Sequence, residues 1–296
     1  MSITGLEVPM EAGPRDTASE ETACKAQRSG LPRVTLCSTV CDAAQALSAE
    51  HTVATLVQRP LAEDVARAFD EYVASRPRWP GADELHALEA THGRVAIIDF
   101  TSVPQDQAQG DALAGATGYG RDLPPRKSAN VASARTAIEL VLSVLPAELA
   151  SVVMNDASEL LAALRRHTGR RQFILRLELN LGDTCQRWHR DLNISRSIVT
   201  YCGPGTLVAH EEGVSRADGG DVIAVDSAHV VQAGVGDVLI MKGGIWDGVE
   251  VRDGPLVRPI AGATMAGAAH RAPTIGPVPS CAAHRLMLKV DVSEDF

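Results

Sequence analysis

The chain is poor in aromatic residues, which make up 3% of its 296 positions. Hydrophobic residues nonetheless reach 45%, so a core must be built from Ala, Val, Leu and Ile. No apolar run reaches the roughly 18 residues of a membrane-spanning helix. The segment Met1 to Arg15 has no apolar stretch of the kind that a secretory signal needs. We therefore expect a cytoplasmic protein without a membrane partner.

Basic residues and cysteines are also scarce. The formal net charge is -9 and the sequence pI is about 5.5, which argues against nucleic-acid binding, because that needs a basic surface. Six cysteines in a chain of this length do not indicate a disulfide scaffold. Cys37 and Cys41 lack a second pair with zinc-finger spacing, and neither a Walker nor a dinucleotide glycine motif occurs.

The chain changes character along its length. Residues 1–30 are polar and are expected to be a disordered tail, and residues 31–296 are expected to form one domain. Within it, residues 31–169 are the helix-rich part and residues 170–296 the β-rich part. Periodicity and proline positions predict strands over 51–58 and 95–100, helices over 60–75, 83–92, 128–145 and 156–167, and a loop over 105–127.

The β-rich part contains short strand patterns separated by turns. They cover residues 173–179, 197–201, 237–242 and 285–291, with glycine and proline turns such as Gly203-Pro204-Gly205 between them. Short strands at this spacing are typical of an antiparallel barrel or jelly roll. The pattern predicts an α+β fold whose β core is supported by helices, mostly from the N-terminal half.

The segment Trp188-His189-Arg190-Asp191 carries the strongest chemical signal. On an extended chain, residues two apart point to one face, so His189 and Asp191 can face the same point. With a distant histidine they would complete a 2-His-1-carboxylate set, which binds Fe(II) and leaves positions open. His270 is the favoured third ligand and His284 the alternative. In isolation, the pair also fits a histidine hydrogen-bonded to an aspartate without a metal, and Cys185 fits either a buried residue or a thiol near the metal.

The order His189, Asp191, His270 and Arg285 resembles that of double-stranded β-helix, cupin-like dioxygenases that depend on Fe(II) and 2-oxoglutarate. The resemblance implies a jelly-roll core with the metal on His189, Asp191 and His270. It also implies that Arg285 binds the far carboxylate of 2-oxoglutarate, with the hydroxyls of Thr200 and Tyr201 as further cofactor-binding candidates.

Three motifs resemble an uncharacterised bacterial family, domain of unknown function 1826. They are Cys185 to Asp191, Thr200 to Thr206, and His270 to Pro273 followed by Arg285 to Leu288. The likeness covers roughly residues 50 to 292. Genes of that family are often associated with zinc homeostasis, which keeps a zinc-linked function open.

The resemblance to cupin-like dioxygenases implies an Fe(II), 2-oxoglutarate-dependent dioxygenase that hydroxylates an unidentified small molecule or peptide. Two alternatives stay open at this point. The first is a non-redox zinc protein of metal homeostasis, since histidine and carboxylate ligands accept both metals. The second is a structural barrel that has lost its metal.

Overall fold

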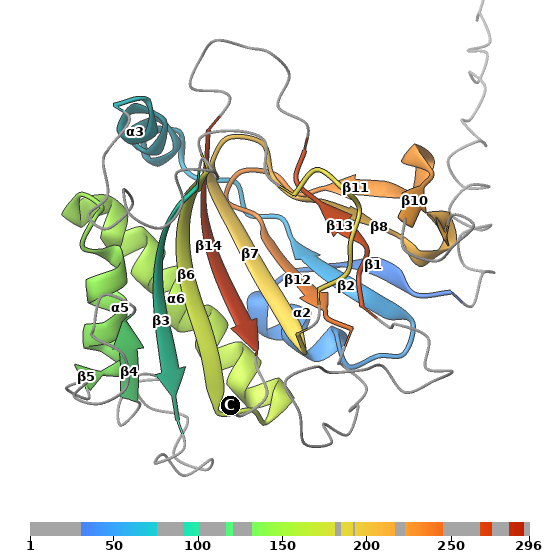
Figure 1. The fold of residues 1–296 in the computed structure, drawn as a ribbon, viewed down its shortest axis with the longest axis horizontal. Helices are drawn as coiled ribbons and strands as arrows, with labels where there is room; N and C mark the ends of the chain where they lie inside the picture. Colours follow the sequence, from blue (N-terminus) through green and yellow to red (C-terminus); the bar gives the residue numbers. More distant parts are fainter. Residues whose placement is uncertain are drawn as a thin grey trace, which may run out of the picture. The chain divides into compact units, whose positions relative to one another are not determined.

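A nine-stranded sheet organises the part of the chain that the computed structural model describes (Figure 1). The described residues are 31–75, 91–100, 117–120, 132–180, 185–191, 193–216, 223–244, 267–273 and 284–292. Those from Pro32 onward belong to one compact unit. No helix in these ranges is long and apolar enough to cross a membrane.

The strand order of the large sheet is β1-β2-β12-β7-β14-β6-β3-β4-β5. β1 and β2 are parallel, and the other neighbours are antiparallel. The bounds are Arg33–Cys37 for β1, Thr52–Val57 for β2, Thr91–Asp99 for β3, Thr117–Gly120 for β4, Ala132–Ser133 for β5, Gln172–Asn180 for β6, Ser195–Cys202 for β7, Val238–Lys242 for β12 and Arg285–Val292 for β14.

Shorter strands form two small sheets. The three-stranded sheet has the order β11-β8-β13, and β9 and β10 form a two-stranded one. Two single-turn 3-10 helices, η2 and η3, lie between these strands along the chain. The bounds are Leu207–Ala209 for β8, Glu211–Gly213 for η2, Val214–Arg216 for β9, Ile223–Val225 for β10, Ser227–His229 for η3, Val230–Gln232 for β11 and His270–Arg271 for β13.

The helices start and stop where their local chemistry allows. α2 (Val40–Ala46) follows Thr39, whose side chain accepts a hydrogen bond from the Asp42 amide. α3 spans Glu63–Ala74, and α5 (Ala134–Leu142) follows the N-cap Ser133. α6 (Ala147–Thr168) begins after Pro146 and ends at Gly169, whose φ of 66° suits glycine.

Two apolar clusters lie on opposite faces of the large sheet. The larger cluster packs the helices against one face and includes Leu286, Leu288 and Val290 of β14. The smaller cluster contains Met287 of β14 together with Val208 of the three-stranded sheet. Because side chains alternate along a strand, Arg285, Lys289 and Asp291 share the face of Met287, away from the helices.

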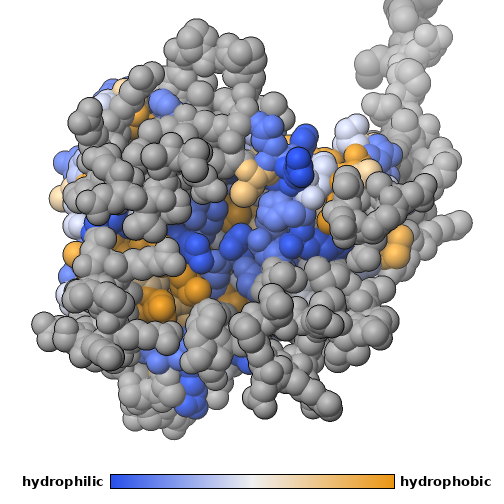
Figure 2. All heavy atoms as spheres, viewed as in Figure 1, coloured by the Kyte–Doolittle hydropathy of each residue, from blue (hydrophilic) through white to orange (hydrophobic). Residues whose placement is uncertain are grey.

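That second face is where polar groups gather. Figure 2, in the same view as Figure 1, shows hydrophilic residues near the middle of the molecule, where β14 and β7 run in the ribbon. The face is therefore hydrophobic beneath the three-stranded sheet and charged along β14, which places a polar site between two layers of the fold.

The structure confirms a mixed α+β fold with a large, mainly antiparallel sheet. The strands predicted at 51–58, 173–179, 197–201, 237–242 and 285–291 all occur, with shifted ends. The helix predicted over 156–167 was wrong at its start, because α6 begins at Ala147 directly after Pro146. Proline has no amide hydrogen to lose at a helix start, so Pro146 suits the start of α6, whereas α5 has already ended at Leu142.

Other elements were missed by the sequence predictions, differ from them, or lie outside the described residues. β1, α2 and the strands β8 to β11 were not predicted. Part of the loop predicted over 105–127 is strand β4, and the helix predicted over 128–145 is shorter and preceded by β5. The tail at 1–30 and nearly all of the helix at 83–92 lie outside the described residues.

Candidate metal centre

The segment 185–191 holds two of the three candidate ligands without being a regular strand. One isolated β-bridge joins His189 to His270 on β13. Arg190 lies between the ligands, and its guanidinium contacts Glu211 with N–O distances of 2.7 and 2.9 Å, and the carbonyl of Gly267. Residue alternation thus sends Arg190 away from the side occupied by His189 and Asp191.

His270 reaches the same point from a distant part of the sequence. The amide of His189 donates to the carbonyl of His270 at 3.0 Å, and the amide of His270 donates back to the carbonyl of His189 at 3.0 Å. This reciprocal pair places the two imidazoles side by side, with ring centroids 4.4 Å apart. Two short backbone hydrogen bonds therefore fix the relation between the two histidines.

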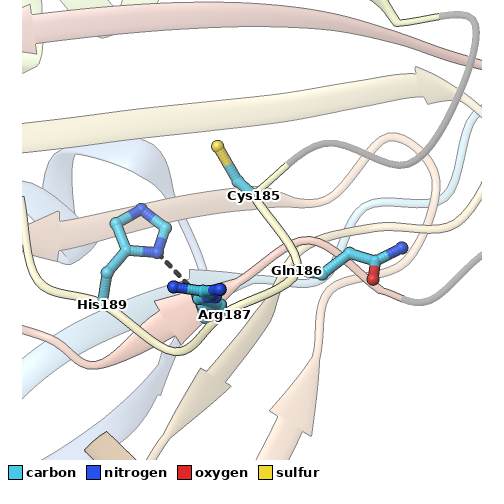
Figure 3. Close-up of a pocket in the computed structure, with 4 residues that line it drawn as sticks. All are labelled: Cys185, Gln186, Arg187 and His189. Carbon is cyan, nitrogen blue, oxygen red and sulfur yellow. Dashed lines mark hydrogen bonds between the residues drawn. The ribbon is translucent and has the colours of Figure 1, made fainter. Parts of the chain in front are cut away.

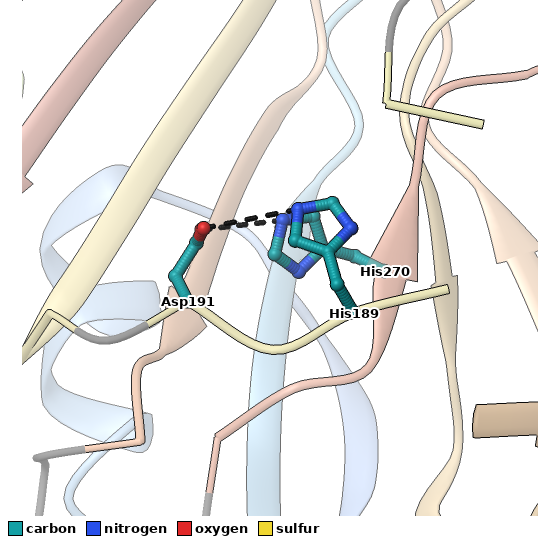
Figure 4. Close-up of side chains that lie close together, drawn as sticks. All are labelled: His189, Asp191 and His270. Atoms are coloured by element: carbon teal, nitrogen blue, oxygen red, sulfur yellow. Dashed lines mark ion pairs between the residues drawn. The ribbon is translucent and has the colours of Figure 1, made fainter. Parts of the chain in front are cut away.

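The three side chains converge, as Figure 4 shows. Nε2 of His270 lies 3.2 Å from Oδ2 of Asp191, and Nε2 of His189 lies 3.8 Å from Oδ1. One ligand atom from each residue fits within a span of 4.8 Å. Among the described His, Cys, Asp and Glu residues, these three form the group that could hold a metal ion.

Hydrogen bonds to backbone carbonyls fix which ring nitrogen is free. Nδ1 of His189 is 2.9 Å from the carbonyl of Arg187, and Nδ1 of His270 is 3.1 Å from the carbonyl of Ala268. A carbonyl can only accept, so each Nδ1 carries a hydrogen and each Nε2 faces Asp191, where it can donate to the carboxylate if protonated or coordinate a metal if not. When both Nε2 atoms are unprotonated, two lone pairs and a carboxylate face one another, and a metal ion among them would match all three. The donor set thus fits a metal.

The electrostatics of the three groups agree with that arrangement. Burial, with His270 nearby, lowers the pKa of His189, which keeps the ring neutral and able to coordinate. Burial alone would raise the pKa of Asp191, but the imidazole of His270 and the guanidinium of Arg196 hold it well below its usual range. Asp191 is therefore ionised at neutral pH, as a metal ligand must be.

An open pocket of about 670 Å³ adjoins the group (Figure 3). Among the described residues it is lined by Cys185, Gln186, Arg187 and His189. Cys185 is exposed and adopts a φ of 51°, which is unusual for a residue other than glycine. The thiol is not one of the three grouped ligands. The pocket gives the His189 edge of the site access to solvent.

Arg285 is buried at the start of β14, with 3% of its surface exposed. Its Nη2 donates to the hydroxyl of Thr206 at 3.0 Å, and it makes no ion pair with any residue that the structure describes. Nε of Arg285 is buried and has no hydrogen-bond partner there. Burial lowers the pKa of Arg285 to about 10. Within the described residues, the side chain is thus a buried cation without a direct ion pair, although the Glu178 carboxylate is near enough to offset part of the effect of burial on its pKa.

Other predicted residues occupy different surroundings. Thr200 pairs with Met287 across the β7–β14 ladder and lies on the polar face. Tyr201 points to the helix side, where its hydroxyl donates to Asp156 at 2.7 Å, so the structure corrects its expected contact with a cofactor. The physical reason is alternation: Thr200 and Tyr201 are adjacent on β7 and point to opposite faces of the sheet. His284 is buried just before β14, outside the group of three.

A family model covers the part of the chain that contains this site. The model of the family "Protein of unknown function (DUF1826)" matches residues 38–291, which is most of the chain. The chain belongs to this family. No curated protein matches it. All three candidate ligands of this DUF1826 protein lie within the matched residues.

Several solved structures share a distant likeness of fold with this DUF1826 protein. A Pseudomonas putida prolyl-4-hydroxylase is 13% identical with a TM-score of 0.37, covering 87% of this chain and 100% of that one. A putative oxygenase from Shewanella oneidensis is 12% identical with a TM-score of 0.40, covering 89% and 90%. A full-length Neurospora crassa protein, solved in complex with alpha-KG and 5-formyluracil, is 11% identical with a TM-score of 0.42, covering 90% and 86%. At this similarity, the site geometry has to carry any functional argument.

The sequence did not predict the charged side chains that surround the ligands. Arg196 bridges Asp191 and Asp291, while Arg190 joins the ligand segment to Glu211. Charged residues inside otherwise buried strands were the available signal, since such residues are seldom buried without a partner. Their partners, however, lie far away in the sequence and follow only from the strand register.

Proposed function

We propose that this protein is a mononuclear non-haem Fe(II), 2-oxoglutarate-dependent oxygenase with His189, Asp191 and His270 as metal ligands. The convergence of two Nε2 lone pairs and an ionised carboxylate carries the proposal. Three protein ligands of this kind leave coordination positions open for a co-substrate and oxygen. In this proposal the large sheet and the facing three-stranded sheet are the two layers of a cupin-like jelly roll.

Arg285 supports 2-oxoglutarate as the co-substrate. A buried guanidinium without a carboxylate partner among the described residues is unfavourable by itself, and a planar carboxylate matches its donors well. Thr206 and Arg285 would hold the distal carboxylate, and Thr200 lies on the same face of the sheet. Three other cations of the sheet strands are engaged elsewhere: Arg196 and Arg176 contact Asp291, and Lys242 donates to the carbonyl of Ala49.

When bound, iron(II) would bind and activate oxygen, and 2-oxoglutarate would supply two electrons as it becomes succinate and carbon dioxide. The residues of the chain would orient the bound groups and keep water out of the site. Both Nδ1 hydrogen bonds hold the imidazoles in the ligand tautomer, and Arg285 would set the direction of the co-substrate. The buried side of the site, at His270, keeps water out, whereas the pocket beside His189 admits a substrate, which we propose is a small molecule or a peptide.

A zinc protein without redox chemistry would use the same three ligands but would leave the buried Arg285 unexplained. The test is metal analysis of protein purified without oxygen, followed by calorimetry with 2-oxoglutarate on the Fe(II)-loaded protein. His189→Ala and Asp191→Ala should abolish metal binding, and His51→Ala, at an exposed histidine outside the group, should not. Full metal content in either ligand variant would refute the assignment. Iron binding without 2-oxoglutarate binding at millimolar concentration would refute the oxygenase.

A further inference from the structure

Arg196 connects the candidate ligand Asp191 to the interior of the large sheet. It lies near the start of β7, directly opposite Asp291 of β14 in the ladder. Its Nε and Nη2 donate to the two carboxylate oxygens of Asp291 at 2.5 and 3.0 Å. Its third nitrogen, Nη1, lies 2.7 Å from Oδ2 of Asp191, which makes an ion pair without hydrogen-bond geometry. One guanidinium thus joins two carboxylates from distant segments.

The far end of this chain of charges is firmly held. Asp291 is 3% exposed, and beyond Arg196 it also meets Nε of Arg176 at 3.4 Å and accepts a hydrogen bond from Asn193 at 3.3 Å. β7, β6 and the residues before β7 therefore all meet at one buried carboxylate. Asp191, in contrast, lies on a segment without regular secondary structure. Arg196 thus connects the firmly held carboxylate of Asp291 to a ligand-bearing segment without regular secondary structure.

We propose that Arg196 is a positioning residue that, together with Asp291, holds the carboxylate of Asp191 in place for the metal. This inference rests on the proposed metal site and adds a residue to it. The planar fork of arginine can contact Asp291 through two nitrogens and Asp191 through the third, whereas the single ammonium of lysine cannot reproduce that geometry. Partners that orient metal ligands typically contribute about 10- to 100-fold in metal affinity.

Positioning and simple electrostatics predict opposite results for Arg196. A fixed cation beside a metal site repels the metal, so removing its charge should tighten binding if charge alone matters. If Arg196 positions Asp191, the same change should weaken binding because the carboxylate loses its orientation. The sign of the change in affinity therefore separates the two accounts.

The test is anaerobic titration with Co(II), followed by visible absorption, of the full-length wild type and four variants. Arg196→Met and Arg196→Lys should each raise the Co(II) dissociation constant about 10- to 100-fold and alter the Co(II) spectrum. Arg196→Met combined with Asp291→Asn removes both charges of the buried pair, which guards against misfolding, and should be equally weak. Arg176→Met removes a contact to Asp291 but none to Asp191, and should stay within about twofold of the wild type.

The outcomes are distinct. If folded Arg196→Met and the double variant bind Co(II) as tightly as the wild type, or more tightly, the positioning inference is refuted. The same follows if Arg176→Met weakens binding as much as Arg196→Met, because the effect would then come from Asp291 alone. If the wild type itself does not bind Co(II), the proposed metal site fails, and the inference fails with it.

Discussion

Replacing Arg285 with methionine should stabilise the metal-free protein while removing its affinity for 2-oxoglutarate. The guanidinium is 3% exposed and has Thr206 as its hydrogen-bond partner, and burial lowers its pKa from the ordinary arginine value to about 10. At about 1.4 kcal/mol per pH unit, burying the charged form costs about 3 kcal/mol. Because neutral pH lies below both values, the group is charged in both states and the full cost applies.

Part of that gain is lost again in the variant. The hydrogen bond to Thr206 is worth about 1 kcal/mol, and Met does not replace it. We therefore expect a net stabilisation of roughly 1 to 2 kcal/mol in urea denaturation of the metal-free protein. In calorimetry, losing a charge-assisted pair with the distal carboxylate should cost about 2 to 5 kcal/mol, or about 30-fold or more in affinity.

Lys289 offers a matched control on the same strand and face. Its Nζ lies 2.6 Å from Oε2 of Glu178, and the pKa of Glu178 is lowered because Lys289 and Arg176 outweigh the effect of burial. Lys289→Met should therefore destabilise the protein, by about 1 to 3 kcal/mol, since it leaves a partly buried carboxylate without its main partner. If Arg285→Met is destabilising by more than about 1 kcal/mol and still binds 2-oxoglutarate, the guanidinium has a structural task and our reasoning is wrong.

Two further predictions concern the surroundings of the site. Tyr201→Phe should lower the free energy of unfolding by about 1 to 3 kcal/mol, because Asp156 loses a buried hydrogen-bond donor. The same variant should leave Co(II) affinity unchanged. A change in metal affinity would contradict the placement of Tyr201 on the helix side. Co(II) affinity should drop as pH falls through the pKa of His189, which lies below the ordinary histidine value, because protons then compete with the metal for that ring. Affinity measured at a series of pH values should therefore still be falling below about pH 6.5, and a curve that is flat there would contradict this competition.

The parts of the fold that the sequence predicted are those with a strong local pattern. β6 alternates apolar and polar residues, and its burial alternates in the same way, so a period of two revealed it. The strands of the small sheets are only two or three residues long and show no period. α2 has seven residues, too few for a clear helical stripe. Its stability comes from packing onto the sheet, which the sequence does not reveal.

The same distinction holds for the candidate site, where some features follow from the local sequence and others depend on strand register. The shared direction of His189 and Asp191 follows from spacing along an extended chain, so local geometry was enough to predict it. The bridge from Arg196 to Asp291 depends on which residues of β7 and β14 lie opposite each other. That register is set by the packing of the whole sheet, so it cannot be predicted from the residues next to Arg196 or Asp291 in the sequence. Thr200 and Tyr201 were both predicted to bind the cofactor, but these adjacent residues point to opposite faces of β7.

The place of β14 between β7 and β6 has a consequence for synthesis. Of the described strands, β14 is the last to leave the ribosome, yet it hydrogen-bonds on both sides and completes the middle of the large sheet. A chain that has been translated only as far as β13 exposes two unpaired strand edges, β6 and β7, each a template for association with another molecule. Folding of the sheet must therefore wait for these final residues. Translation that stops before Arg285 should give an aggregation-prone product, although every candidate metal ligand has already been made.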